Sequence, residues 1–228
     1  MNISAIEPHL VSRVKHAAAR YALCVDAHSV YGRSVAAFVG AHAMNEDIQA
    51  LAAQYQAALQ LEDWVAAERA LRVLAKLDTR NPSVLYNLGL VLRRQKQFEG
   101  AIQALRNALA IAPGHHNARF ELAMALFESG ALPDAEGEFM RYVKAVPDDT
   151  GGLYHLGVIL LKVGKPEEAR RMLGRALVEN ESASVSLALA EAELACGLKE
   201  PAERRLRSLV ADNPALQEMA AAVLDGLG

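Results

Sequence analysis

Residues 82–115 read PSVLYNLGLVLRRQKQFEGAIQALRNALAIAPGH, and they contain every element of a repeating pattern. The alanine at position 101 belongs to a column that recurs with spacings of 34, 34, 34 and 33 residues, at Ala67, Ala101, Ala135, Ala169 and Ala202. Thirteen residues before each alanine lies a second, mostly leucine column, at Gln54, Leu88, Leu122, Leu156 and Leu189. Columns that agree in one register indicate a chain built from repeats of about 34 residues.

Further columns follow the same register. Small residues come directly after four of the leucine-column positions, at Gly89, Ala123, Gly157 and Ala190. Bulky apolar residues come four positions after the alanines, at Leu71, Leu105, Phe139, Leu173 and Leu206, and prolines close three repeats at Pro113, Pro147 and Pro214. Two helices approach closely only where side chains are small. We therefore expect the small residues to face the alanines of the second helix in the same repeat.

The turns inside the repeats carry a glycine signal. Gly130, Gly164 and Gly197 lie where a first helix would end, and glycine adopts the left-handed backbone of a helix C-cap at little cost. Glu62 and Lys96 occupy the equivalent positions of the first two repeats and carry no such signal.

Residues 48–216 resemble the tetratricopeptide repeat (TPR) family, on the period of 34 and on the leucine, small-residue, alanine and proline columns. The resemblance implies an all-α fold: a right-handed superhelical solenoid of about five helix-turn-helix repeats, with N-terminal helices and a C-terminal capping helix. The expected repeats are 48–81, 82–115, 116–149, 150–182 and 183–216. Residues 217–228 are expected to form the end of the capping helix.

Residues 1–47 lie outside the repeat register. An apolar stripe predicts an amphipathic helix over about residues 8–30, and its members are Leu10, Val14, Ala18, Tyr21 and Val25. This helix either covers the open end of its own array or docks into a groove, its own or a neighbour's. Docking on a neighbour would make the protein a homo-oligomer.

Composition excludes several classes of protein. A formal net charge of −3 and a pI of about 6.2 argue against nucleic acid or anionic membrane as the main partner, because both require a concentrated basic field. The longest apolar run, 34–43, is about half of the roughly 20 residues that a spanning helix needs. The two cysteines are far apart and no secretory leader opens the sequence, so we expect a cytoplasmic protein without a transmembrane segment.

Catalytic and metal-binding patterns are missing from the sequence. It contains no HExxH, GxSxG or Walker loop, so we expect neither an enzyme nor a cofactor. His16, Cys24 and His28 share one face of the N-terminal helix, but no carboxylate on that stripe would orient an imidazole, and we expect no metal there.

The resemblance also implies a binding surface. In TPR arrays the first helix of each repeat lines a concave face. The residues expected there are Tyr86, Asn87, Leu90, Arg93, Arg94, Phe120, Glu121, Met124, Phe127, Tyr154, His155, Val158, Leu161 and Lys162. Tyr86, Phe120 and Tyr154 are 34 residues apart and would form an aromatic ladder. Such an apolar face suits an amphipathic helix or an apolar peptide.

One familiar TPR role does not fit this face. Chaperone-binding TPR domains resemble one another in a clamp of lysine, asparagine and arginine that holds a terminal carboxylate. Asn87 matches that clamp, but Glu121 and His155 occupy the equivalent positions in the next two repeats. We therefore do not expect a carboxylate clamp here.

The sequence thus predicts a non-enzymatic adaptor or scaffold that binds a helical or apolar peptide segment in a concave groove and that can self-assemble through the N-terminal helix. The alternative is an accessory subunit or chaperone that docks on an enzyme or secretion complex. The layout is similar to magnetosome TPR scaffold proteins and to type III secretion chaperones. The first of these resemblances implies self-assembly through the N-terminal helix.

Overall fold

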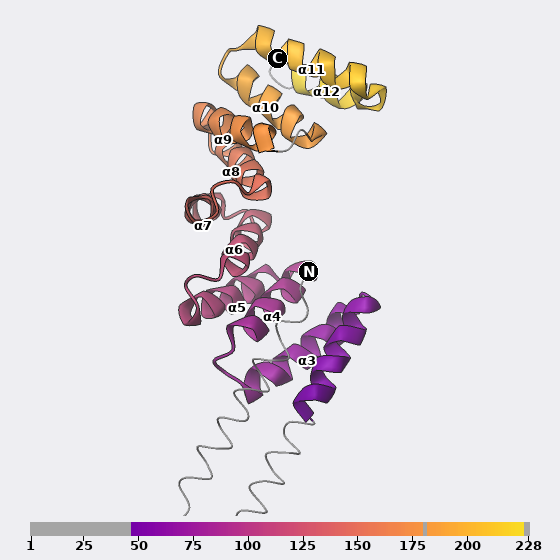
Figure 1. The fold of residues 1–228 in the computed structure, drawn as a ribbon, viewed down its shortest axis with the longest axis vertical. Helices are drawn as coiled ribbons and strands as arrows, with labels where there is room; N and C mark the ends of the chain where they lie inside the picture. The colour runs from indigo at the N-terminus through magenta and orange to yellow at the C-terminus, as the bar shows by residue number, and fades with distance from the viewer. Residues whose placement is uncertain (1–46, 180–181, 226–228) are drawn as a thin grey trace, which may run out of the picture. The chain divides into compact units, whose positions relative to one another are not determined.

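The structure is a computed structural model that describes residues 47–179 and 182–225 (Figure 1). Within these ranges all regular structure is helical. Residues 47–60 are helical, and the helices that follow are α3 (Trp64–Leu77), α4 (Pro82–Arg94), α5 (Phe98–Ile111), α6 (His116–Glu128), α7 (Leu132–Ala145), α8 (Thr150–Lys162), α9 (Pro166–Glu179), α10 (Ala183–Ala195), α11 (Lys199–Asp212) and α12 (Gln217–Asp225). A short 3₁₀ helix, η2 (Pro214–Leu216), precedes α12. The predicted all-α repeat fold is confirmed, and the predicted N-terminal helix lies outside the described residues.

Polar side chains fix where several helices begin. Asp63, Asn81, Asp149 and Ser182 each precede a helix, and the oxygen of each side chain accepts a backbone N–H of the first turn. The distance is 2.9 Å from Asp63 Oδ1 to the nitrogen of Ala66 and 2.6 Å from Asp149 Oδ2 to that of Gly152. The imidazole of His115 does the same for α6, since its Nδ1 accepts the N–H of Ala118 at 3.1 Å. Such caps satisfy N–H groups that have no partner inside the helix.

The described residues form two compact units, divided between Ala118 and Arg119. In the first unit the helices from 47–60 to α5 enclose a core of fully buried aliphatic side chains, among them Leu71, Leu74, Val84, Val91 and Leu105. Tyr55 stands where the later repeats have their small residue, and it is 3% exposed. Burial, together with the nearby Tyr86, raises the pKa of Tyr55 to about 12.

The second unit runs from Arg119 through α12. Its largest fully buried side chains are Phe139, Leu153, Ile159 and Leu173. A further cluster of Leu187, Ala190, Ala202, Leu206 and Ala220 joins α10, α11 and α12. The helix after the last repeat therefore covers part of that repeat's apolar face, as a capping helix does.

A buried ion pair also joins α10 to α11. Glu193 is 6% exposed, and its two carboxylate oxygens accept hydrogen bonds from Arg205, at 3.1 Å from Nε and 2.8 Å from Nη2. This bidentate geometry compensates the carboxylate for the water that burial removes. The pair holds α11 in one position along α10.

Two small residues of the first helices, Gly89 and Gly157, lie closest to leucines of the second helix, where we had expected the column alanines. A Cβ built on Gly89 would lie 2.5 Å from Cγ of Leu105, and a Cβ on Gly157 would lie 2.5 Å from Cγ of Leu173. Both leucines follow the column alanine by four residues, which is one helical turn. The leucine side chain occupies the space that the missing side chain leaves, so the two helices pack without a void.

In the described part of the chain, each of the five turns inside the repeats contains a residue with a left-handed backbone. The φ angle is +86° at Gly130 and +77° at Gly164 and Gly197. Two turns reach the same region without glycine, with φ of +53° at Glu62 and +61° at Lys96. A side chain in this region costs roughly 1–2 kcal/mol per residue, so the first two turns carry strain that the later three lack.

We expect Lys96→Gly to raise the free energy of unfolding by about 0.5–1 kcal/mol, because relief of the left-handed strain exceeds the entropy that glycine adds to the unfolded chain. The matched reverse change is Gly164→Lys, where an added Cβ has no atom within 4 Å and only the backbone is strained. In urea unfolding followed by circular dichroism, the midpoint should rise for Lys96→Gly and fall for Gly164→Lys. Equal midpoints would contradict the left-handed conformation at Lys96.

Candidate peptide-binding pocket

The residues predicted to line a groove come from three helices. Tyr86, Asn87, Leu90, Arg93 and Arg94 lie on α4; Phe120, Glu121, Met124 and Phe127 lie on α6; Tyr154, His155, Val158, Leu161 and Lys162 lie on α8. Their exposure differs within each helix. Leu90 is 7% exposed and Glu121 is 8% exposed, whereas Arg94 and Lys162 are open to solvent.

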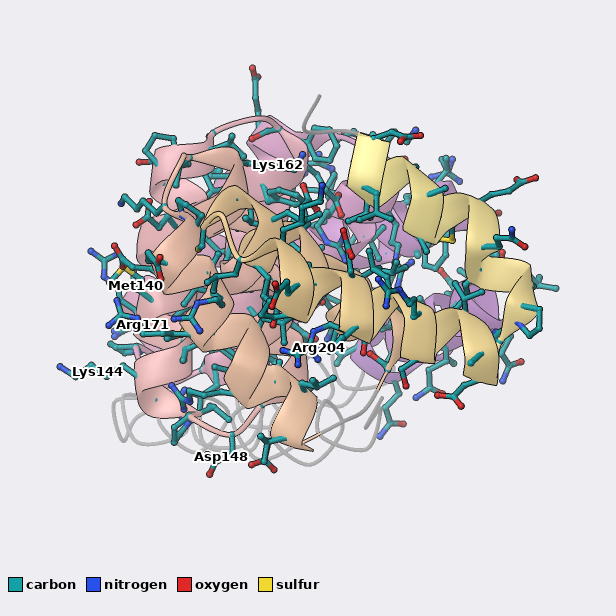
Figure 2. All side chains as sticks on the ribbon, turned by 90° about the horizontal axis from the view of Figure 1, so that it is seen from above. Met140, Lys144, Asp148, Lys162, Arg171 and Arg204 are labelled. Carbon is teal, nitrogen blue, oxygen red and sulfur yellow. The ribbon has the colours of Figure 1, made fainter. Side chains whose placement is uncertain are left out.

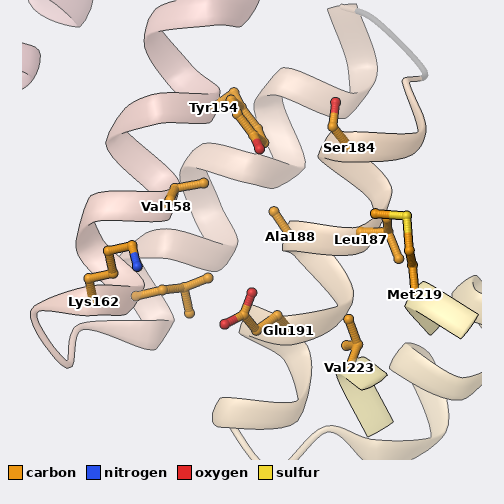
Figure 3. Close-up of a pocket in the computed structure, with 10 residues that line it drawn as sticks. Tyr154, Val158, Lys162, Ser184, Leu187, Ala188, Glu191, Met219 and Val223 are labelled. Atoms are coloured by element: carbon orange, nitrogen blue, oxygen red, sulfur yellow. The ribbon is translucent and has the colours of Figure 1, made fainter. Parts of the chain in front are cut away.

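The structure brings the α8 residues together with residues of α10 and α12 around a pocket of about 340 Å³ (Figure 3). The members from α8 are Tyr154, Val158, Leu161 and Lys162; those from α10 are Ser184, Leu187, Ala188 and Glu191; those from α12 are Met219 and Val223. All ten lie in the second unit. This pocket is the candidate functional site.

The pocket has an apolar middle and two different ends. Val158, Leu187 and Ala188 lie between the ends, and Met219 and Val223 form the wall on the side of α12 (Figure 3). Tyr154 and Ser184 contribute hydroxyl groups on one side of the view in Figure 3, whereas Lys162 and Glu191 contribute charges on the other. Lys162 and Glu191 are both exposed, and neither forms an ion pair among the described residues. A ligand with apolar side chains in its middle and charge at one end matches this arrangement.

The position of α8 is set at its first turn. Asp149 caps the helix through the N–H of Gly152 and also lies beside Tyr142 on α7. Burial, then the neighbouring Asp149, raises the pKa of Tyr142 to about 12. A Cβ on Gly152 would lie 2.6 Å from the Tyr142 ring, so glycine is required for the close approach of α7 and α8. These contacts hold α8, the helix that carries the predicted residues Tyr154, Val158, Leu161 and Lys162 of the pocket.

Phe120 makes packing contacts inside the second unit. Its ring is 5.5 Å from that of Phe139, 5.3 Å from that of Tyr142 and 5.8 Å from that of His155, all in edge-to-face geometry. It does not line the pocket of Figure 3. In the first unit the ring of Tyr86 lies 4.9 Å from the imidazole of His115.

Sequence reasoning missed the contribution of α12 to the pocket. Met219 and Val223 lie beyond the last repeat, where the columns stop, so no register position pointed to them. One signal was available. Val223 follows Pro214 by nine residues, as Leu122 follows Pro113 and Leu156 follows Pro147, and this spacing identifies α12 as the equivalent of a first helix.

No group of three or more His, Cys, Asp or Glu side chains in the described part of the chain could hold a metal ion. The predicted stripe of His16, Cys24 and His28 lies outside the described residues. Over 47–179 and 182–225, no helix is long and apolar enough to cross a bilayer.

Fold and pocket together define the class of protein: an all-α helix-turn-helix repeat protein with an apolar recess between successive first helices. Tetratricopeptide repeat family models match residues 52–116 and 154–215 and, in a second form, residues 92–156. The chain belongs to the tetratricopeptide repeat family. Repeats of this family are interaction modules that bind protein or peptide partners, and the fold is in general a non-enzymatic scaffold.

Curated proteins from distant organisms are similar over part of the chain. Protein O-mannosyl-transferase TMTC3 of Homo sapiens is 28% identical over 158 residues, which is 66% of this chain and 17% of that protein. Protein FlbA of Caulobacter vibrioides is 28% identical over 56% of this chain and 22% of its own length. The peroxisomal targeting signal receptor of Eremothecium gossypii is 28% identical over 53% of this chain and 21% of its own length. The chain thus spans less than a quarter of the length of these curated relatives.

Solved structures share the fold at lower sequence identity. A TPR protein of Parabacteroides merdae superposes with a TM-score of 0.72 at 22% identity, covering 78% of this chain and 72% of that one. MamA of Desulfovibrio magneticus gives 0.71 at 17% identity, covering 75% and 97%. YrrB, a TPR protein with an unusual peptide-binding site, gives 0.66 at 17% identity, covering 76% and 89%.

Proposed function

We propose that this protein is a non-enzymatic adaptor or scaffold that binds a helical or apolar peptide segment, and that the pocket between α8, α10 and α12 is where the segment is anchored. The observation that carries the proposal is the pocket itself, an apolar recess of about 340 Å³ with hydroxyl groups at one end and opposite charges at the other. Ligand sites are typically apolar concavities with a few placed polar groups.

The spacing of the lining residues favours a helical ligand. Tyr154, Val158 and Leu161 recur on α8 at intervals of four and three residues, so they form one stripe along the helix. Ser184, Ala188 and Glu191 recur on α10 with the same intervals. A ligand helix that places apolar side chains at matching intervals can contact both stripes along its length.

The wider groove predicted from the sequence remains part of this proposal. It adds Tyr86, Asn87, Leu90, Arg93 and Arg94 of the first unit, and Phe120, Glu121, Met124, Phe127 and His155 of the second. The name of the Eremothecium gossypii relative describes a receptor for a targeting signal, and YrrB is described as having a peptide-binding site. Both descriptions are consistent with a peptide ligand here. The cytoplasmic location expected from the cysteine content belongs to the same proposal.

The test is a peptide selection followed by binding measurements. Peptides with an amphipathic helical pattern are displayed on phage, selected on the immobilised full chain, and titrated by fluorescence anisotropy. We expect Tyr154→Ser/Val158→Ser to raise the Kd of a selected peptide at least tenfold, because both side chains are partly exposed and line the pocket. Phe120 is left unchanged, since its ring packs against the buried Phe139 and its loss would disturb the fold.

The matched control is Val178→Ser, because Val178 is an apolar residue of α9 that is 85% exposed and lies outside the pocket. It should leave the Kd unchanged. Circular dichroism must show equal helical content in all three proteins. Selected peptides whose affinity is insensitive to the double change would contradict the pocket as the binding site.

A further inference from the structure

The caps of the first helices include one residue of a different chemical kind. Asn81, His115, Asp149 and Ser182 follow one another at spacings of 34, 34 and 33 residues, and each accepts the backbone N–H three residues further on. The first helices of four successive repeats therefore begin at equivalent positions. In three of these caps the acceptor is an oxygen. In His115 it is the imidazole nitrogen Nδ1, which lies 3.1 Å from the nitrogen of Ala118.

An imidazole can cap a helix in only one of its protonation states. Nδ1 of His115 accepts the N–H of Ala118 through a lone pair, which places the ring proton on Nε2. A proton added to Nδ1 gives a cation with two N–H donors and no acceptor, so the bond to Ala118 is lost. The amide of Asn81 and the hydroxyl of Ser182 do not change in this way. The carboxyl group of Asp149 keeps an acceptor oxygen with or without a proton.

The surroundings of His115 favour the neutral ring. The side chain is partly buried, and its ring lies 4.9 Å from that of Tyr86 on α4. Burial is the main cause that lowers the pKa of His115 below its ordinary value, and the adjacent His116 adds to the lowering. Tyr86 is an uncharged phenol, and the last turn of α5, residues 108–111, is apolar, so neither offers a carboxylate to an imidazolium. A positive ring would also face the positive end of the α6 dipole.

The loop that carries this cap connects the second repeat to the third. The backbone N–H of His115 donates to the carbonyl oxygen of Ala112 at 3.0 Å, which fixes the residue in the loop. In the equivalent loop of the next repeat, the exposed Asp148 extends into solvent and the cap Asp149 follows it (Figure 2). That loop carries two acidic residues where the loop before α6 carries Gly114 and His115. An acidic loop suits the positive end of a helix, whereas the loop before α6 gains positive charge as the pH falls.

We infer that His115 is a pH-sensitive cap, whose protonation releases the first turn of α6 and so loosens the connection between the second and third repeats in mild acid. The folded protein holds the pKa of His115 below its ordinary value of 6.5, so the unfolded chain takes up the proton first. The stability that the cap contributes is therefore complete above that value, and it is lost as the pH falls through the lower pKa of the folded protein. The inference does not depend on the proposed peptide pocket.

Nuclear magnetic resonance of the full chain tests the inference at single atoms. In a titration from about pH 7.5 to about pH 5, the amide signal of Ala118 should shift with the same midpoint as the His115 ring, and that midpoint should lie below about 6.5. The amide of Val84, which Asn81 caps in the same way, should not shift over this range. The exchange protection of the Ala118 amide should fall roughly five- to tenfold, as expected for a lost helix cap. In His116→Asn the midpoint of His115 should rise, because a repelling charge is removed.

The matched variant is His115→Asn, because asparagine is the cap at the equivalent position of the preceding repeat. This variant should keep the fold and abolish the titration of the Ala118 amide. Relative to it, the thermal midpoint of the unaltered protein should fall by roughly 2–4 °C between about pH 7.5 and about pH 5. An Ala118 amide that stays fixed while the His115 ring titrates would overturn the inference. So would a His115 midpoint above about 6.5, or a difference between the two thermal midpoints that does not change with pH.

Discussion

Replacement of Arg205 by leucine is expected to lower the free energy of unfolding by about 3–5 kcal/mol, the range typical of breaking a buried ion pair. The change leaves Glu193, which is 6% exposed, without the two hydrogen bonds at 3.1 and 2.8 Å that Arg205 donates. The carboxylate then remains buried without a compensating charge. Urea unfolding of the second unit's helices, followed by circular dichroism, measures the loss.

Two controls separate the buried charge from the loss of arginine as such. The double change Glu193→Leu/Arg205→Leu should recover most of the stability, because no charge is then left in the interior. Arg141→Leu removes a guanidinium that is 66% exposed, and its partner Glu138 keeps Arg119 at 2.9 Å. This change should cost less than about 1 kcal/mol. A double variant as unstable as Arg205→Leu would show that the pair itself contributes net stability.

Gly157→Ala should destabilise the protein by about 1–3 kcal/mol, although alanine is the better helix former. The new methyl group would lie 2.5 Å from Cγ and 2.8 Å from Cδ2 of Leu173, a side chain with no exposed surface. Either α8 and α9 move apart or Leu173 leaves its rotamer, and both cost packing energy. The midpoint of urea unfolding should fall accordingly.

Gly174→Ala on α9 provides the matched control. Gly174 is also inside a helix, but a Cβ there has no atom within 4 Å. We expect this change to stabilise the protein by about 0.5–1 kcal/mol, because alanine lowers the entropy of the unfolded chain. If both variants were more stable than the parent, the separation of α8 and α9 would be larger than the structure has it.

The repeat columns predicted the fold because they record its packing. Leu156 and Leu173 recur since each repeat buries the same positions, and glycine recurs at 130, 164 and 197 since those turns need a left-handed residue. The columns do not determine which side chains are in contact with one another. Gly157 was expected against Ala169, yet it receives Leu173 one turn later, because a longer side chain is needed to fill the space above a glycine.

The candidate site was predictable on its α8 side and, through Leu187 and Glu191 at the same register positions, in part on its α10 side. Tyr154 and Val158 follow from the repeat register, but Met219 reaches the pocket from more than sixty residues further along the chain. Such a contact depends on how α12 packs, and the spacing of Val223 from Pro214 is the one sequence signal for it. The ion pair between Glu193 and Arg205 also could not be predicted from the sequence, because the two residues lie on different helices and neither belongs to a repeat column.

The turns without glycine have a kinetic consequence. The left-handed strain at Glu62 and Lys96 exists only while those turns are formed, so it raises the energy of the native state. The cost of glycine at Gly164 instead falls on the unfolded chain. When such strain is relieved before the transition state for unfolding is reached, the segment unfolds faster and its folded lifetime is shorter. The first helix pairs are therefore expected to open more often than the later ones, and their backbone amides to exchange with solvent sooner.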